Sequence, residues 1–198
     1  MRRYLGLALD QLGFKDASAS AAEDGVLLWD ATNGYPVVSK NGEWRQIVLK
    51  DGQYSGGITA SQTAALADTA YPLTYTAGIA EGITNGTPAS RLVFGEAGEY
   101  MVSFSAQISS TSASTVDFWF WPRVNGSDVA GSTMKNALHR NGAVLVVSRS
   151  AVFNFAAGDY LEAMWATSNT AGTLNASAAT AFAPAAPAST ISITRLHG

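Results

Sequence analysis

The chain contains no cysteine among its 198 residues, which excludes disulfides, thiolate metal ligands and cysteine nucleophiles. Only 14% of its residues are charged, against about 25% in a typical soluble protein. A soluble monomer normally carries more charge, so the composition favours assembly. The net charge of -3 and the scattered basic residues offer no basic surface, and we expect no nucleic-acid partner. No apolar run approaches the roughly 18 residues that span a bilayer, so we expect no membrane insertion.

Residues for catalysis and metal binding are also scarce. The two histidines, His139 and His197, have no partner at the spacing of a metal site or a catalytic triad. The carboxylates that could form a pair for glycoside hydrolysis are Asp24, Asp30, Glu96, Glu99, Asp159 and Glu162. Most stand beside Gly, Ala or Asn in expected turns, and we expect Asp159 to shape the turn into its strand. The sequence therefore predicts no enzyme activity, no cofactor and no metal site.

The chain has many short segments typical of β-strands, separated by tight turns. Asn33-Gly34, Asn41-Gly42 and Asp51-Gly52 follow candidate strands at 26–30, 35–39 and 43–49. Asn-Gly and Asp-Gly supply the positive φ angles that tight hairpin turns require. We predict a small three-strand β-meander within residues 25–55, preceded by an N-terminal arm of residues 1–24.

The rest of the chain, residues 56–198, has the pattern of a larger β-domain. Residues 56–68 are rich in Gly, Ser, Thr and Ala, and we expect a linker that becomes the first strand of this domain. The further strand candidates are 71–76, 91–94, 99–109, 115–124, 143–155, 159–168 and 190–196. Apolar residues alternate with polar ones from Tyr100 to Ser109, as in a half-buried strand. Short strands with regular turns predict an all-β jelly-roll sandwich.

The candidate strand from Val116 to Val124 carries large aromatics at successive positions. Side chains alternate between the two faces of a strand, so Phe118 and Phe120 point one way and Trp119 and Trp121 the other. We expect the phenylalanines in the core. The tryptophan face needs a second layer or a partner, since an exposed aromatic strand promotes aggregation.

Two interpretations of the tryptophan face are open. Buried between subunits, each tryptophan removes on the order of 200 Å² from water, or roughly 5 kcal/mol. The predicted interface residues are Trp119, Trp121, Asp117, Arg123, Tyr160 and Met164. Alternatively, Trp119, Trp121 and Trp165 line a glycan site. We favour the interface, because obligate oligomer interfaces are the apolar ones.

Four segments resemble a known family in order and spacing: 97–105 (AGEYMVSFS), 123–126 (RVNG), 156–161 (AAGDYL) and 192–196 (SITRL). They are similar to the trimeric tumour-necrosis-factor-like jelly rolls, which include the globular heads of complement. The cysteine-free, polar style, with 68–75 (DTAYPLTY) leading in, looks most like the versions carried by tailed bacteriophages. This resemblance implies a homotrimer with a surface head.

The resemblance predicts a structural role at the virion surface. We expect a homotrimeric capsid decoration or cement protein on the capsid exterior, in contact with the major capsid protein. The candidate anchoring residues are Arg2, Arg3, Tyr4, Leu5, Trp29 and Trp44. The alternative is a receptor-binding tail or fibre-tip protein that recognises a host glycan or protein through loops 125–132 and 169–186.

Overall fold

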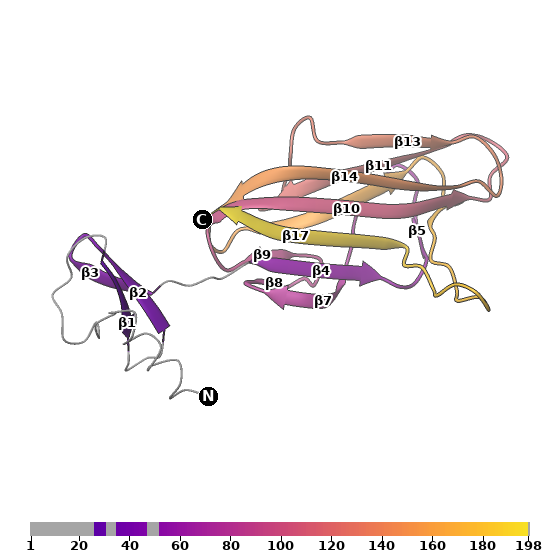
Figure 1. Ribbon diagram of the computed structural model, residues 1–198. Helices are drawn as coiled ribbons and strands as arrows, with labels where there is room; N and C mark the ends of the chain where they lie inside the picture. The colour runs from indigo at the N-terminus through magenta and orange to yellow at the C-terminus, as the bar shows by residue number, and fades with distance from the viewer. Residues whose placement is uncertain (1–25, 31–34, 47–51, 198) are drawn as a thin grey trace. The chain divides into compact units, whose positions relative to one another are not determined.

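A computed structural model describes residues 26–30, 35–46 and 52–197, and every regular element in these ranges is a β-strand (Figure 1). Contacts within the chain divide it into two units, Met1–Leu49 and Lys50–Gly198. This division lies six residues before the predicted boundary at 55/56. The predicted arm, with Arg2, Arg3, Tyr4 and Leu5, lies outside the described residues.

The first unit contains the expected antiparallel meander, with strand order β1-β2-β3 (Leu27–Asp30, Tyr35–Lys40 and Glu43–Gln46). The turn from β2 to β3 has φ angles of 56° at Asn41 and 76° at Gly42, the left-handed values that an Asn-Gly turn allows. Leu28 and Val37 are buried, and Trp44 packs against them. Trp44 therefore contributes to the meander's own core, whereas the Trp29 side chain lies outside the described residues.

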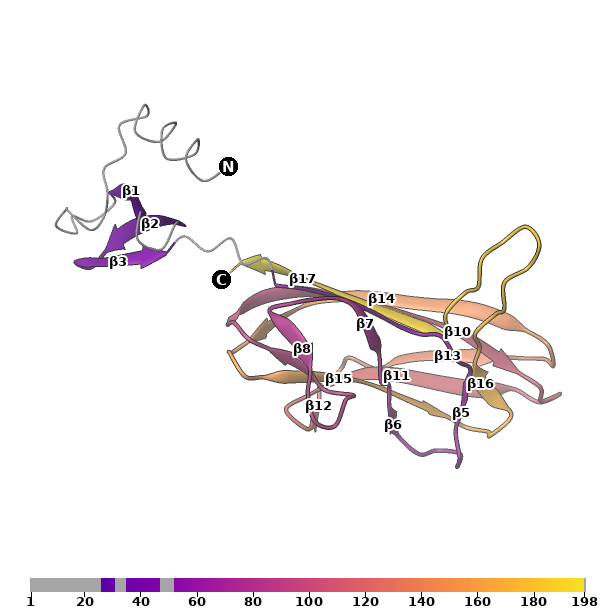
Figure 2. The same cartoon turned by 90° about the horizontal axis from the view of Figure 1, so that it is seen from below.

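The second unit is built from two antiparallel sheets, which Figure 2 shows as two layers. The β10 sheet has β10 (Gly98–Ser110) at its centre. On one edge β10 pairs with β14 (Val144–Phe155), and on the other with β17 (Ser189–His197) and β16 (Gly172–Leu174). The sheet continues through β4 (Gln53–Ile58) to β7 (Thr76–Glu81), and through β16 to β5 (Gln62–Thr63).

The β11 sheet forms the other layer. Its strands are β13 (Met134–Leu138), β11 (Val116–Val124), β15 (Tyr160–Thr167), β9 (Leu92–Phe94) and β8 (Ile83–Asn85), with β12 (Ser127–Asp128) and β6 (Tyr71–Pro72) as short additions. From β10 to β17 the chain moves repeatedly between the two sheets, with all pairing antiparallel. The predicted all-β jelly roll is confirmed by this strand order.

The core lies between the two sheets and follows the predicted side-chain alternation. Phe118 and Phe120 are 0% and 3% exposed, as predicted. The buried apolar side chains of β10 and β17 are Tyr100, Val102, Ala106, Ile108, Ile191 and Ile193. At one end of the core Phe94 stacks on Phe155 with ring centroids 3.7 Å apart. The period-two pattern therefore assigned the core face correctly for these strands.

Two predicted segments differ from the structure in their bounds, because the sequence signal is local and the strand pairing is not. Residues 53–58 were divided between meander and linker, but they form β4, which pairs with β17. A Cβ at Gly56 would lie 2.9 Å from the Tyr54 ring and 2.9 Å from the Tyr75 Cβ. This glycine therefore reflects close packing within a sheet, which the sequence alone does not distinguish from a flexible linker.

The predicted strand 71–76 is likewise divided between the two sheets. β6 pairs with β15, whereas β7 pairs with β4, so the chain changes layer between Pro72 and Thr76. Leu73 and Tyr75 are buried on this crossing, at 0% and 3% exposure. The apolar residues of this predicted strand are therefore core residues of a connection between the two sheets.

The buried hydroxyl of Tyr75 makes the stability of the jelly roll depend on pH in the alkaline range. Its hydroxyl lies 3.0 Å from Ser189 Oγ, which itself donates to the Ser105 carbonyl oxygen, so Tyr75 is the donor. Burial raises the pKa of Tyr75 above its usual value. The folded chain therefore keeps a proton that the unfolded chain releases above about pH 10, and stability falls as pH rises.

We expect Tyr75→Phe to reduce this alkaline loss by up to about 1.4 kcal/mol per pH unit. The measurement is the free energy of unfolding in urea at several pH values from 9 to 11, for the wild-type protein and the variant. An unchanged slope in Tyr75→Phe contradicts the assignment of this proton to Tyr75.

Candidate functional site

The outer face of the β11 sheet carries the two tryptophans singled out in the sequence. Trp119 and Trp121 lie opposite Ala166 and Met164 of β15 and point away from the core. Both indoles are only half-buried, while Phe118 and Phe120 fill the core from the same strand. The predicted division of β11 into a core face and a tryptophan face is therefore correct.

Lys135 on the neighbouring strand β13 lies against the indole ring of Trp119. β13 places Lys135 directly opposite Trp119, with its Nζ 5.5 Å from the centroid of the indole ring. The same Nζ lies 2.9 Å from Asp117 Oδ2. One cation thus pairs with a carboxylate and with an aromatic face, so its charge is balanced within the monomer.

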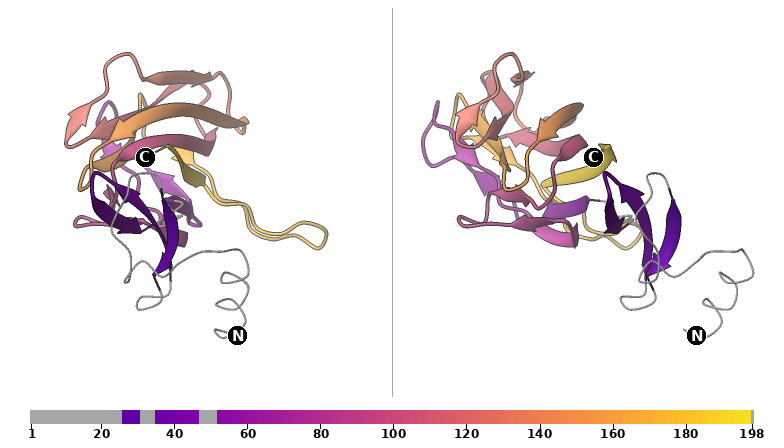
Figure 3. Two further views of the ribbon diagram at one scale, coloured as in Figure 1. Left: turned by 60° about the vertical axis from the view of Figure 1, so that its left-hand side comes forward. Right: turned by 90° about the vertical axis from the view of Figure 1, so that its left-hand side faces the viewer.

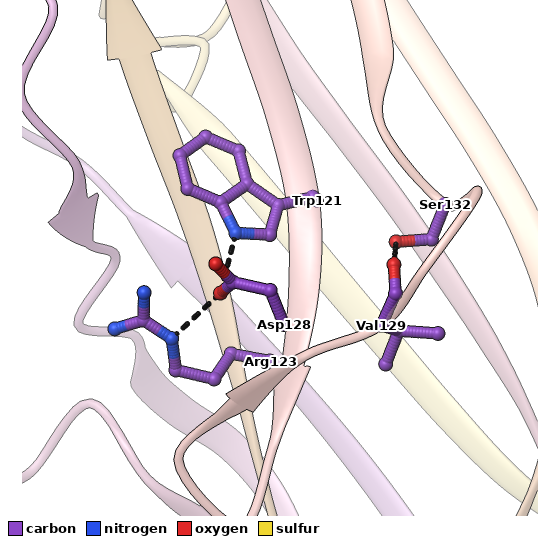
Figure 4. Close-up of polar contacts among 5 residues, drawn as sticks. All are labelled: Trp121, Arg123, Asp128, Val129 and Ser132. Atoms are coloured by element: carbon purple, nitrogen blue, oxygen red, sulfur yellow. Dashed lines mark hydrogen bonds and ion pairs between the residues drawn. The ribbon is translucent and has the colours of Figure 1, made fainter.

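The second tryptophan belongs to a network around Asp128 (Figure 4). The turn at Asn125 and Gly126, with φ angles of 49° and 81°, folds β12 back so that Asp128 lies opposite Arg123. Trp121 Nε1 and Arg123 Nε both donate to Asp128 Oδ1, each at 2.8 Å. These bonds, the one from Arg123 foremost, lower the pKa of Asp128, so its carboxylate stays ionised near neutral pH.

The rest of this face is covered by the chain itself. Met164 is 2% exposed and Glu162 is 7% exposed, where Glu162 Oε1 accepts a hydrogen bond from Ser90 Oγ at 2.8 Å. The Arg91 guanidinium lies 4.3 Å from the centroid of the half-buried Tyr160 ring. Met164 lies opposite Trp121 on the outer face, but it has no free surface to bury against another subunit. The prediction that it contributes to an interface is wrong for that reason.

A shallow groove of about 370 Å³ remains open beside the tryptophans. Its lining comes from the β11 sheet and from two connecting segments. The sheet contributes Trp119, Trp121 and Ala166. The segment between β5 and β6 contributes Asp68 and Ala70, and the segment between β11 and β13 contributes Asp128, Val129 and Thr133. We call this the tryptophan groove. Trp165, the third tryptophan of the predicted glycan site, is 2% exposed in the core and cannot reach a ligand there.

The predicted carboxylate and histidine candidates are not gathered into one site. Asp159 accepts from Asn125 Nδ2 and from the Ala156 amide, both at 2.7 Å, as expected for a residue that shapes a turn. These bonds lower the pKa of Asp159. His139 Nδ1 lies 3.2 Å from Thr115 Oγ1. Asp24 and the His197 side chain lie outside the described residues, among which no three potential metal ligands cluster.

Sequence reasoning missed the outer face of the β10 sheet. Three valines of β14 point outward with large exposed fractions: 57% for Val144, 61% for Val146 and 52% for Val152. The sequence obscured this face, because residues 144–147 (VLVV) put apolar side chains at both parities. The alternation is readable only from the pairing of β14 with β10, which places Val146 opposite Gln107 and Val152 opposite Met101.

Beside these valines the β10 face is lined by small hydroxyl side chains. Ser103 Oγ is hydrogen-bonded to Ser150 Oγ, and Ser105 Oγ to Thr190 Oγ1, each at 2.8 Å. A hollow of about 630 Å³ crosses the strands here, lined mostly by Ser, Thr and Gly. These hydroxyls bond to each other across strands, so another surface can cover them without leaving them unpaired.

No protein-family model matches this chain, and no curated protein matches its sequence. Its fold is similar to that of murine APRIL in a crystal structure at pH 8.5. The two are 9% identical, with a TM-score of 0.49, over 74% of this chain and 100% of that one. It is also similar to Eiger TNF from S. frugiperda, at 11% identity and a TM-score of 0.48, over 74% of this chain and 93% of that one. The bacteriophage part of the sequence resemblance stays a prediction.

The loop between β16 and β17 is the other prominent surface feature. Figure 2 and the left view of Figure 3 show it standing clear of the sandwich, beyond the β10 sheet. An isolated bridge joins Ser177 and Ala186, and the Thr180 amide donates to the Ala183 carbonyl oxygen at 2.9 Å. These bonds present Phe182 at 91% exposure. Of the two loops predicted to bind a receptor, this one therefore carries an exposed aromatic tip.

Proposed function

We propose that this protein is a homotrimeric structural protein that associates through the outer face of the β10 sheet. We further propose that the trimer decorates a bacteriophage capsid, as the sequence resemblance implies. The single observation that supports self-association is the exposure of Val144, Val146 and Val152 of β14 on a face of low charge. Apolar, charge-depleted surfaces of this kind are typical of permanent subunit interfaces.

Charge distinguishes the two outer faces. Along β14 from Val144 to Val152 and the facing part of β10 from Met101 to Ser109, the outward residues are Val, Ser, Met and Gln, with no charged side chain. Beyond them, Asn154 faces Glu99 at the end of this strand pair. The tryptophan face instead carries Asp117, Lys135, Arg123 and Asp128, all paired within the monomer. Covering those pairs removes water from charged groups and gains no new partner for them. The β10 face therefore supports self-association better than the predicted tryptophan interface.

The receptor-binding alternative is favoured by one observation, the exposed Phe182 at the loop tip. A large aromatic side chain at that exposure gains free energy when a partner buries it. In this second function the trimer is a tail or fibre-tip protein, and the 169–186 loop contacts the host.

Two measurements test the proposal: the mass of the protein in solution and its location on the particle. We expect light scattering of the full chain to give the mass of a trimer, and electron cryo-microscopy of the particles that carry it to place the trimer on the capsid lattice. A stable monomer contradicts the self-association. Density at the tail tip contradicts the decoration role and supports the receptor-binding alternative, and absence from the particles contradicts both.

A further inference from the structure

We infer that the tryptophan groove is a binding site for a neutral saccharide. The site lies on the β11 sheet, whereas the face proposed for self-association belongs to the β10 sheet, and all residues that line the groove come from one subunit.

The base of the groove fits a flat, hydroxyl-rich ring. Trp119 and Trp121 are two positions apart on one strand, so their backbone positions are separated by about 6.8 Å along the same face. Indole rings are large, rigid contact surfaces with an electron-rich face, which suits the polarised C–H groups of a sugar ring. Both indoles are half-buried, so their positions are fixed by the protein while part of each remains accessible.

The rim of the groove supplies hydrogen-bond acceptors that are already oriented. Asp128 receives its bonds from Trp121 and Arg123 at Oδ1 alone, and its side chain is 56% exposed. Among the described residues nothing bonds to Oδ2, so that oxygen is available to a ligand donor. Asp68 and Thr133 line the same groove and add a carboxylate and a hydroxyl. A few placed polar groups beside aromatic walls are the usual composition of a small-molecule site.

Charge and size select among ligand classes. The nearby cations, Arg123 and Lys135, are each held by a carboxylate, so an anionic ligand meets two acidic residues and no free positive charge. An apolar protein surface would leave Asp68 and Asp128 dehydrated without a donor. A neutral saccharide offers hydroxyl donors to these carboxylates and C–H faces to the indoles. The volume of about 370 Å³ is within the range of pockets that hold small ligands.

The test uses the full chain and a set of polysaccharide probes: dextran, yeast mannan and laminarin as neutral polymers, and alginate as an acidic one. Affinity electrophoresis measures the retardation of the protein by each polymer. We expect at least one neutral polymer to retard the wild-type protein and alginate to have no effect. Retardation by none of the neutral polymers, or by alginate alone, overturns the proposal.

Three variants assign any binding to the groove. We expect Trp119→Ala with Trp121→Ala to abolish the retardation while light scattering shows an unchanged mass. Asp128→Asn preserves the side-chain size and removes the charge, and we expect at least tenfold weaker binding. The control is Leu27→Ala, which removes a 42% exposed apolar side chain of the other unit and should bind like wild type.

Three outcomes overturn the assignment. If Asp128→Asn and the double tryptophan variant both bind the polymer as the wild-type protein does, the groove is not the binding site. Dissociation of the folded double tryptophan variant into monomers shows that the indoles lie between subunits. If that variant does not fold, full binding by Asp128→Asn is by itself sufficient to reject the proposal.

Discussion

Val146→Asp combined with Val152→Asp should convert the proposed trimer into folded monomers at micromolar concentration. Each valine is more than half exposed in the isolated chain, and burying that exposed part in an interface contributes about 1 kcal/mol. An aspartate at the same place leaves a buried charge without a partner, which costs about 3–5 kcal/mol. Both substitutions occur in each of the three subunits. The expected loss in association is therefore well above a thousandfold.

Light scattering after size exclusion measures the mass, and circular dichroism reports whether the monomer keeps its β-structure. The matched control is Leu66→Asp, which places the same charge at a 65% exposed apolar residue between β5 and β6 and should leave the trimer intact. A valine variant that keeps the trimer mass contradicts association through the β10 face. Dissociation by Trp119→Ala with Trp121→Ala instead would restore the interface predicted from the sequence.

Phe155→Ala should destabilise the jelly roll by about 3–5 kcal/mol. Phe155 is 2% exposed and lies among three aromatic rings, with centroids 3.7 Å from Phe94, 5.8 Å from Phe153 and 5.9 Å from Tyr100. Removing this ring leaves a cavity between the two sheets that rigid neighbours cannot fill.

Phe182→Ala makes the same chemical change at a side chain that is 91% exposed, and we expect a change within about 0.5 kcal/mol. The measurement is urea unfolding of both variants at one protein concentration, because subunit association adds to the apparent stability. A loss below about 1 kcal/mol in Phe155→Ala would show that the aromatic cluster contributes little to the fold.

Most of the fold was predictable because its strands carry strong local signals. β10, β11, β14, β15 and β17 were all predicted close to their observed bounds. Period-two alternation and Asn-Gly turns act over a few residues, so they can be read without knowing what pairs with what. The strands that were missed, such as β4 and β13, lack alternation or contain glycines, and their partners in β17 and β11 hold them in place.

The candidate site was predictable only in part, because some of its contacts depend on strand pairing and not on local sequence. Alternation along β11 placed Trp119 and Trp121 together on the outer face. It did not indicate that Lys135 lies against one indole and Asp128 bonds to the other, because these contacts come from neighbouring strands. The sequence also did not indicate the burial of Met164, whose neighbours across the sheet, Trp121 of β11 and Pro72 of β6, come from distant parts of the chain.

The sequence by itself determined the fold class, the division of the aromatic strand into a core face and a tryptophan face, and the scarcity of charge. All three depend on residue type and short-range periodicity, which tertiary contacts do not alter. Only the tertiary structure decided which outer face combines exposed valines with few charged side chains. That property depends on strand register, which places the valines of β14 beside uncharged neighbours and surrounds the tryptophans with paired charges.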